Sequence, residues 1–230
     1  MKVLTAAALV IAVASAGGTA ASEETATVGP TDAGADYGRA LDEAVAAARG
    51  GDREAARGFF VKLAAEYPGK PEIYYNGALT WEFDDDGNRY RGKELNRAAA
   101  GYQKALEVDA DFVPARFNLG VVWQKLGYLE EAARDYRLVA KSGGDLAAQA
   151  EYNLALVLKA QGRPAEAAAV LEKEKLAYDD AARVRLLALL AEATGDYGRA
   201  IALWKRTLVL DETPPWGALG RKHLRTLREY

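Results

Sequence analysis

Apolar residues recur at three- and four-residue intervals along most of the chain. One run holds Leu154, Leu156, Val157 and Leu158, and a second holds Ala167, Val170 and Leu171. This spacing gathers the apolar side chains on one face and predicts amphipathic helices of about three turns. A short glycine-containing turn separates the two runs, so the pattern predicts helices that come in pairs.

The places of small, bulky and turn residues repeat along the chain. In one unit these places are held by Leu119, Gly120, Trp123, Gly127, Ala132 and Tyr136. Displaced by 35 residues, the same places are held by Leu154, Ala155, Leu158, Gly162, Ala167 and Leu171. Related sets occur on both sides of these two units. Downstream the set is Gly195, Ala200 and Trp204, and upstream the sets are Ala98 with Tyr102 and Ala56 with Phe60. A period of this length is typical of stacked helix pairs, and five units emerge.

Small residues recur where the two helices of a pair would cross. On the first helices they are Ala44, Ala78, Gly120, Ala155 and Ala188, and on the second helices Ala56, Ala98, Ala132, Ala167 and Ala200. The large residues that would fill the gap against the next unit are Phe60, Tyr102, Tyr136, Leu171 and Trp204. A lone unit would leave those side chains in water, so we expect stacking to stabilise the fold.

Together these features resemble the tetratricopeptide repeat family. The turns that carry the resemblance are Gly127-Tyr128-Leu129-Glu130-Glu131-Ala132 and Gly195-Asp196-Tyr197-Gly198-Arg199-Ala200. The resemblance covers about residues 37–230. It implies an all-α fold, a right-handed α-solenoid of about five antiparallel helix pairs plus a C-terminal capping helix. The expected units are residues 37–70, 71–110, 111–145, 146–178 and 179–212, followed by a capping helix over 214–230.

The first residues have the pattern of an export signal. Lys2 precedes an apolar run from Val3 to Ala14, and Ala14-Ser15-Ala16 has the small-x-small order of a cleavage site. We therefore expect a signal peptide over 1–16, cleaved after Ala16, and a periplasmic or secreted protein; an uncleaved anchor is the alternative. The run is shorter than the roughly 20 apolar residues that span a bilayer, so no integral membrane segment is expected in the mature chain. Residues 17–36 are poor in large apolar residues, which predicts a disordered linker.

Composition narrows the chemistry. The chain has no cysteine, which excludes disulfides, thiolate metal sites and thiol nucleophiles. Its only histidine is His223, so the commonest general base and metal ligand is scarce. The formal net charge is -3, without the broad basic field that favours nucleic acid. We therefore expect no catalytic residue, no metal, no cofactor and no nucleic-acid partner.

An aromatic residue followed by asparagine recurs at one point of three first helices, as Tyr75-Asn76, Phe117-Asn118 and Tyr152-Asn153. Asparagine is a poor helix former, so three in register need a reason. Because first helices line the concave face of such a solenoid, an amide ladder there could bind the backbone of an extended peptide. The alternative is that these asparagines bond neighbouring helices. We take these six residues together with Gln124 as the candidate peptide-binding face.

Two segments depart from the repeat. The second unit contains about eight extra residues around Phe83–Gly92, including Asp84, Asp85 and Asp86. Adjacent acids point in different directions, so a solvated loop is favoured over a calcium site. At the other end, Pro214 and Pro215 precede a helix that resembles the first helix of a sixth unit. We expect it to cap the stack with Arg221, Lys222, Arg225 and Arg228 facing solvent, although docking to an acidic partner or anionic membrane is open.

The sequence therefore predicts a protein-protein interaction scaffold or adaptor that binds a peptide or protein segment on its concave face. A self-assembling structural protein of the cell envelope, forming a homo-oligomer through the C-terminal helix, is the alternative. An enzyme built on paired carboxylates is disfavoured because the acidic residues are spread over turns and outer faces.

Overall fold

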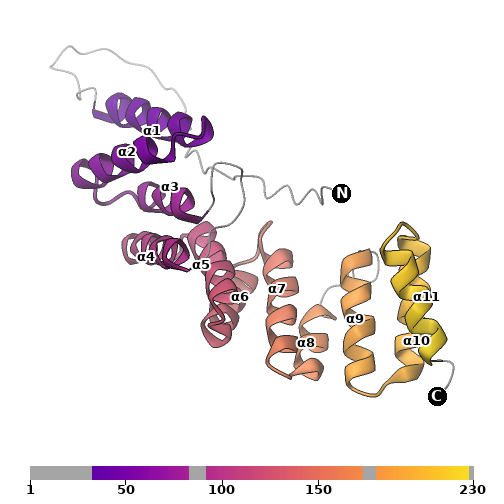
Figure 1. The fold of residues 1–230 in the computed structure, drawn as a ribbon. Coiled ribbons are helices and arrows are strands. Elements are labelled where there is room, and N and C mark those ends of the chain that lie inside the picture. The colour runs from indigo at the N-terminus through magenta and orange to yellow at the C-terminus, as the bar shows by residue number, and fades with distance from the viewer. Residues whose placement is uncertain (1–32, 83–91, 173–179, 228–230) are drawn as a thin grey trace, which may run out of the picture. The chain divides into compact units, whose positions relative to one another are not determined.

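The described part of the chain is helical throughout. The computed structural model describes residues 33–82, 92–172 and 180–227, and within them it has eleven helices and no strand (Figure 1). They are α1 (Ala33–Arg49), α2 (Arg53–Glu66), α3 (Pro71–Glu82), α4 (Lys93–Val108), α5 (Val113–Leu126), α6 (Leu129–Ser142), α7 (Ala147–Ala160), α8 (Pro164–Leu171), α9 (Ala181–Ala193), α10 (Tyr197–Leu210) and α11 (Trp216–Leu227). The expected signal peptide and the Asp84–Asn88 segment lie outside the described residues. None of the described helices is long and apolar enough to cross a membrane.

The helices form an all-α helical repeat in two compact units. One unit ends at Phe112 and contains α1 to α4, and the other begins at Val113 and contains α5 to α11. Within each unit, every helix packs against the next one along the chain. Neighbouring first helices also touch, since α1 contacts α3 and α5 contacts α7, which in turn contacts α9.

The expected helix pairs follow the repeat units. The pairs α1–α2, α3–α4, α5–α6, α7–α8 and α9–α10 correspond to the five predicted units, and α11 falls within the predicted capping segment. One boundary differs, because α1 begins at Ala33, inside the segment 17–36 expected as a linker. Its alanines and the aromatic Tyr37, which packs against Tyr67 at 5.0 Å between ring centroids, extend the helix upstream.

Glycine closes the turns between paired helices. Gly127 and Gly195 have φ angles of 87° and 80°, a left-handed conformation that costs a side-chain-bearing residue more than glycine. After the second of these turns, Asp196 caps α10 by accepting the backbone N–H of Arg199 at 3.1 Å. The glycines that repeat in the sequence therefore reverse the chain between the helices of a pair.

The small residues lie at the helix crossings, as predicted. All five alanines on the second helices are fully buried, and the four on the first helices are at most 2% exposed. Gly120 lies against Tyr136, where an added Cβ would come within 3.0 Å of the ring. Gly101 on α4 is tighter still, because a Cβ there would lie 2.8 Å from the Cβ of Ala78. Close helix packing therefore depends on small residues at these places.

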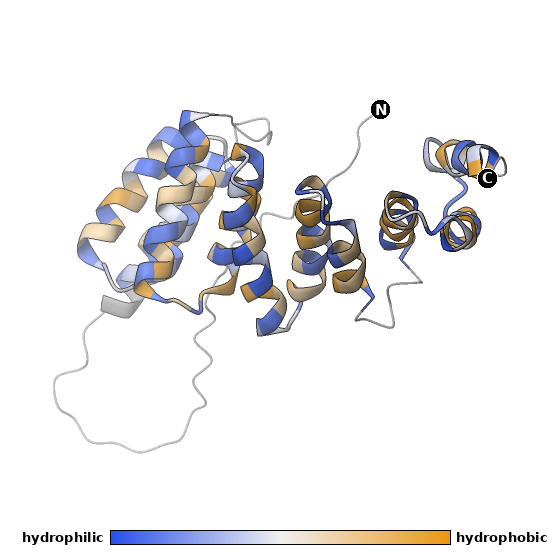
Figure 2. Cartoon of the chain, turned by 90° about the horizontal axis from the view of Figure 1, so that it is seen from below, coloured by the Kyte–Doolittle hydropathy of each residue, from blue (hydrophilic) through white to orange (hydrophobic). Residues whose placement is uncertain are grey.

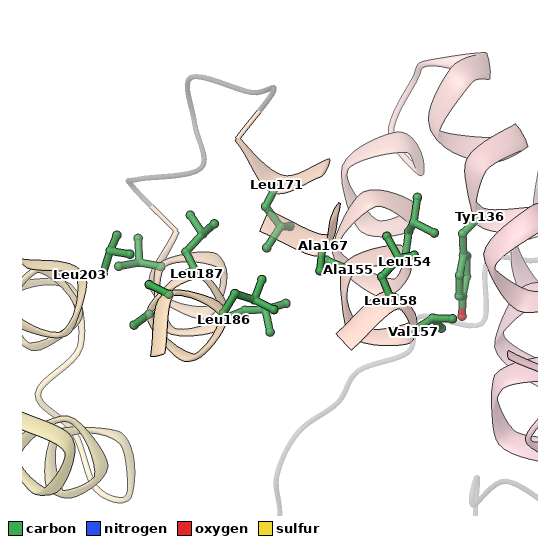
Figure 3. Packing of buried hydrophobic residues seen from close by; sticks show 14 of the residues in the cluster. Tyr136, Leu154, Ala155, Val157, Leu158, Ala167, Leu171, Leu186, Leu187 and Leu203 are labelled. Atoms are coloured by element: carbon green, nitrogen blue, oxygen red, sulfur yellow. The ribbon is translucent and has the colours of Figure 1, made fainter. Parts of the chain in front are cut away.

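The large residues of the repeat are buried within their units. Phe60 is 4% exposed, and Tyr102, Tyr136, Leu171 and Trp204 are fully buried. In Figure 3, Tyr136, Leu154, Leu158, Leu171 and Leu187 belong to a single apolar cluster that passes from one pair to the next. Figure 2 shows the matching pattern on the ribbon, with hydrophobic and hydrophilic residues on different sides of the helices. Burial is thus shared between repeats, as a stacked fold requires.

The last helix covers the end of this cluster. A Cβ added at Gly220 would lie 3.1 Å from Cδ2 of Leu208, so the glycine lets α11 approach α10 closely. The His223 ring stacks on Trp204 with centroids 4.4 Å apart, and its Nδ1 lies 2.9 Å from Oε1 of Glu192. Arg221, Lys222 and Arg225 are exposed, as expected for a capping helix, while Arg228 lies outside the described residues.

Candidate functional site

The first aromatic-asparagine pair belongs to the core of its unit. Tyr75 and Asn76 on α3 are each 3% exposed. The Tyr75 ring lies between Tyr102 and Phe112, at centroid distances of 5.7 and 5.5 Å. The Asn76 amide has no hydrogen-bond partner among the described residues and borders a small cavity of about 20 Å³. These two side chains offer almost no surface to a ligand.

The second pair is half-buried on α5 and takes part in packing. The Phe117 ring lies 5.9 Å from that of Tyr136. Gln124, one of the predicted site residues, accepts a hydrogen bond from the Tyr136 hydroxyl at 3.0 Å. Asn118 is half-buried beside them. Phe117 and Gln124 therefore stabilise the α5–α6 pair, and part of each side chain stays exposed to solvent.

The third pair borders a distinct open pocket. Tyr152 and Asn153 on α7 line a pocket of about 380 Å³ between α7 and the start of α9. The remaining lining residues are Ala148 and Gln149 from α7 and Asp180, Ala182 and Arg183 from the start of α9. We call this set the α7–α9 pocket.

The sequence of α7 explains how its polar side chains reach one side. Gln149, Tyr152 and Asn153 stand at i, i+3 and i+4, which share a helix face. The opposite face is buried and holds Ala150, Leu154, Ala155, Val157 and Leu158. Packing of the apolar face into the core thus turns the polar face toward the pocket.

The far wall of the pocket is fixed by a buried arginine. Arg183 is 7% exposed, donates to the carbonyl of Ala148 and forms an ion pair with Glu151 at 3.6 Å. Its backbone N–H donates to Asp180 at 2.8 Å, which caps α9. Because a buried charge must be paired, these contacts hold the start of α9 against α7.

Three side chains of the pocket can bond to a ligand. Neither the Gln149 amide nor the Asn153 amide hydrogen-bonds to another described residue, and each offers donors and an acceptor. Burial raises the pKa of the Tyr152 hydroxyl above its ordinary value of 10.0. The hydroxyl is therefore protonated at neutral pH and can donate as well as accept a hydrogen bond.

A separate group of contacts joins α9 to α11 and to the segment before it. Arg185 forms an ion pair with Asp211 at 3.1 Å, and its guanidinium lies 4.3 Å from the centre of the Trp216 ring. Trp216 is 41% exposed. An exposed aromatic residue of α11 is thus in cation–π contact with an ion-paired arginine of α9.

The chemical groups near the pocket are of few kinds. Across residues 33–82, 92–172 and 180–227, no group of three or more His, Cys, Asp or Glu side chains could hold a metal ion. His223 contacts Trp204 and Glu192 and is not among the residues that line the pocket. Besides Asp180 and Arg183, which are bonded within the chain, the pocket offers two amides and a phenol, which can donate hydrogen bonds to polar groups and accept them.

Sequence reasoning missed Gln149, Asp180 and Arg183. Gln149 could have been found from its four-residue offset from Asn153 on the predicted helix. Arg183 had a weaker signal, a charge inside the apolar stretch that begins at Ala181. Its contact with Ala148 joins residues 35 apart, which no local pattern reveals.

The fold and the repeat define a class of protein. Residues 148–173 match the family model for the tetratricopeptide repeat, and these residues include most of α7 and all of α8. The five helix pairs of the described residues have the helical-repeat fold of tetratricopeptide proteins, and the α7–α8 pair matches the family model itself. Comparison with curated protein sequences gives no match.

Solved structures of the same fold give three instructive neighbours. MamA from Desulfovibrio magneticus is 18% identical, with a TM-score of 0.64 over 78% of this chain and 97% of that chain. YrrB, described as a TPR protein with an unusual peptide-binding site, is 22% identical, with a TM-score of 0.60 over 74% and 82%. Pseudomonas aeruginosa PilF is 16% identical, with a TM-score of 0.61 over 84% and 89%. At such identities the similarity concerns the fold.

Proposed function

We propose that this protein is an interaction module that binds an extended segment of a partner polypeptide at the α7–α9 pocket. The observation that carries the proposal is the set of hydrogen-bonding groups that Gln149, Tyr152 and Asn153 present in the pocket. The start of α9 forms the other side of the pocket, and Arg183 fixes it to α7. An extended peptide presents N–H and C=O groups in alternation, which match amide side chains with one donor and one acceptor group each. Catalysis and nucleic-acid binding form no part of the proposal.

The fold supports a binding role. Stacked helix repeats form extended surfaces used to hold other chains, and a fold neighbour, YrrB, carries a peptide-binding site by its description. The α5 helix contacts α7, so the exposed parts of Phe117 and Asn118 would lengthen the surface by one first helix. Tyr75 and Asn76 are left out of the proposed site because both are buried.

Truncating both amides of the pocket should weaken peptide binding by roughly tenfold or more, because each amide would lose its bonds to the ligand backbone. The test uses the double variant Gln149→Ala with Asn153→Ala in the full chain. A peptide is first selected on the wild-type chain from a random phage-displayed library, and its affinity is then measured by fluorescence anisotropy. Circular dichroism confirms that the variant is folded.

A matched pair of residue types provides the control. Asn96 and Gln103 are exposed on α4, a second helix in the other unit, so Asn96→Ala with Gln103→Ala removes the same groups elsewhere. This control should bind within about twofold of wild type, since fully exposed polar groups contribute little. Equal affinity of the pocket variant and the wild type for the selected peptide would refute the site.

We further propose that the protein acts outside the cytoplasm after cleavage of its leader. The support is the apolar run Val3–Ala14 followed by the Ala14-Ser15-Ala16 pattern. Mass spectrometry of the protein purified from its source is expected to find Gly17 at the N-terminus. A chain that keeps Met1 would contradict cleavage. Self-association through α11 stays a prediction, checked by light scattering over a range of concentrations.

A further inference from the structure

An open groove runs between the last two helices of the chain. It has a volume of about 520 Å³ and is lined by Leu208 of α10 and by Ala218, Arg221, Leu224 and Arg225 of α11. In each of the five pairs, a first helix packs against the second helix that follows it. The α11 helix resembles a first helix, and among the described residues no second helix packs against it in this way, which leaves the groove open.

The floor of the groove is apolar and its edge is basic. Leu208 and Leu224 are half-buried, which leaves part of each side chain in contact with water. Arg221 and Arg225 are exposed, one turn apart on α11, and neither forms an ion pair with another described residue. An apolar strip flanked by unpaired cations at i and i+4 is the complement of an acidic amphipathic helix.

The charge of the two helices strengthens this complementarity. Between them, α10 and α11 carry six Lys or Arg residues and no acidic one, and of these Arg199 is paired with Glu172: Arg199, Lys205, Arg206, Arg221, Lys222 and Arg225. The whole chain has a net charge of -3, so the charge of these two helices is opposite in sign to that of the chain. A local positive field attracts an anionic partner and disfavours a cationic one.

A second copy of this chain fits the groove poorly. Two α11 helices facing each other would bring Arg221 and Arg225 against their own copies, which like-charge repulsion disfavours. The other end of the repeat offers no apolar stripe, because the exposed residues at the centre of α1 are Asp42, Glu43 and Ala46. These observations favour a different protein as the occupant.

We propose that the α10–α11 groove binds an amphipathic helix of a partner protein, with an apolar stripe flanked by Glu or Asp. The helix would lie along α11 as a second helix lies along its first, with its apolar residues on Leu208 and Leu224 and its carboxylates on Arg221 and Arg225. A helix of about 14 residues, the length of α6 and α10, is sufficient to follow the groove. This inference is independent of the peptide site at the α7–α9 pocket.

Two synthetic helical peptides test the proposal on the full chain. Both have leucine at positions i, i+3, i+4 and i+7, and the first carries glutamate on its flanks while the second carries lysine. Fluorescence anisotropy should detect binding of the glutamate peptide and not of the lysine peptide. Affinity should fall as salt is raised, because exposed charge pairs are screened.

Two double variants with equal change in net charge separate the groove from general electrostatics. Arg221→Glu with Arg225→Glu reverses the edge of the groove, and the expected loss of affinity for the glutamate peptide is roughly tenfold or more. Lys205→Glu with Lys222→Glu reverses two exposed charges on the same helices that do not line the groove, and the expected loss is about threefold or less. Sedimentation and circular dichroism establish that each variant is folded.

Each remaining outcome overturns the proposal. Equal losses in the two double variants would mean that only net charge matters. Binding of anionic phospholipid vesicles without binding of the glutamate peptide would identify a membrane-facing end. A concentration-dependent dimer of the wild type that Arg221→Glu with Arg225→Glu abolishes would identify a second copy as the occupant.

Discussion

Replacing Trp204 with alanine is expected to lower the free energy of unfolding by about 3–5 kcal/mol. Trp204 is the largest fully buried side chain of the described residues. Its indole N–H donates to Glu192, and the His223 ring stacks on its face. Its removal would leave a cavity between α9 and α10 and would also take away the support of α11. Urea unfolding followed by circular dichroism measures the change.

The control for Trp204 lies on the same helix. Val209 is 74% exposed, so Val209→Ala should change the unfolding free energy by no more than about 0.5 kcal/mol. If Trp204→Ala were as mild as Val209→Ala, the bulky residue would not be filling the space between successive pairs. The repeat would then need another source of stability.

Replacing Tyr102 with alanine is expected to cost about 3–5 kcal/mol in the unit formed by α1 to α4. The ring is fully buried against Tyr75, and its hydroxyl donates to the carboxylate of Glu82, which is also fully buried. The substitution removes both the packing and one donor to a buried carboxyl group, and each loss is destabilising. Thermal and urea unfolding of the full chain report the combined effect.

Tyr102→Phe divides that cost between packing and hydrogen bonding. The ring stays and only the donor to Glu82 is lost, so the expected cost is about 1–3 kcal/mol. Gln103→Ala, at an exposed neighbour on α4, should be close to neutral. A phenylalanine variant as stable as wild type would show that the hydroxyl contributes nothing, whereas one as unstable as the alanine variant would show that the ring contributes nothing.

The repeat made the fold predictable from the sequence. Ala132 and Tyr136 recur with Ala167 and Leu171 at a fixed offset, and the same helix crossing requires a small residue and a large one each time. The burial of these residues in the structure follows from that requirement. The start of α1 was harder to predict because alanine-rich sequence before Tyr37 reads equally well as linker or helix.

The candidate site was less predictable because one motif has two environments. Tyr75-Asn76 and Tyr152-Asn153 look alike in the sequence, yet the first pair is buried and the second borders an open pocket. Tyr75 is covered by the rings of Tyr102 and Phe112, whereas the place of Tyr102 is taken by the smaller Leu171 in the unit of Tyr152. The residues around an aromatic-asparagine pair in the sequence cannot show whether side chains from elsewhere in the chain bury it.

Amide hydrogen exchange of the full chain, with and without a peptide selected on it, tests the central claim most directly. The account predicts new protection in the first half of α7, around Gln149 to Asn153, and at the start of α9, around Arg183. Protection confined to the second helices α8 and α10, or no change in α7 and α9, would contradict binding on the first-helix face.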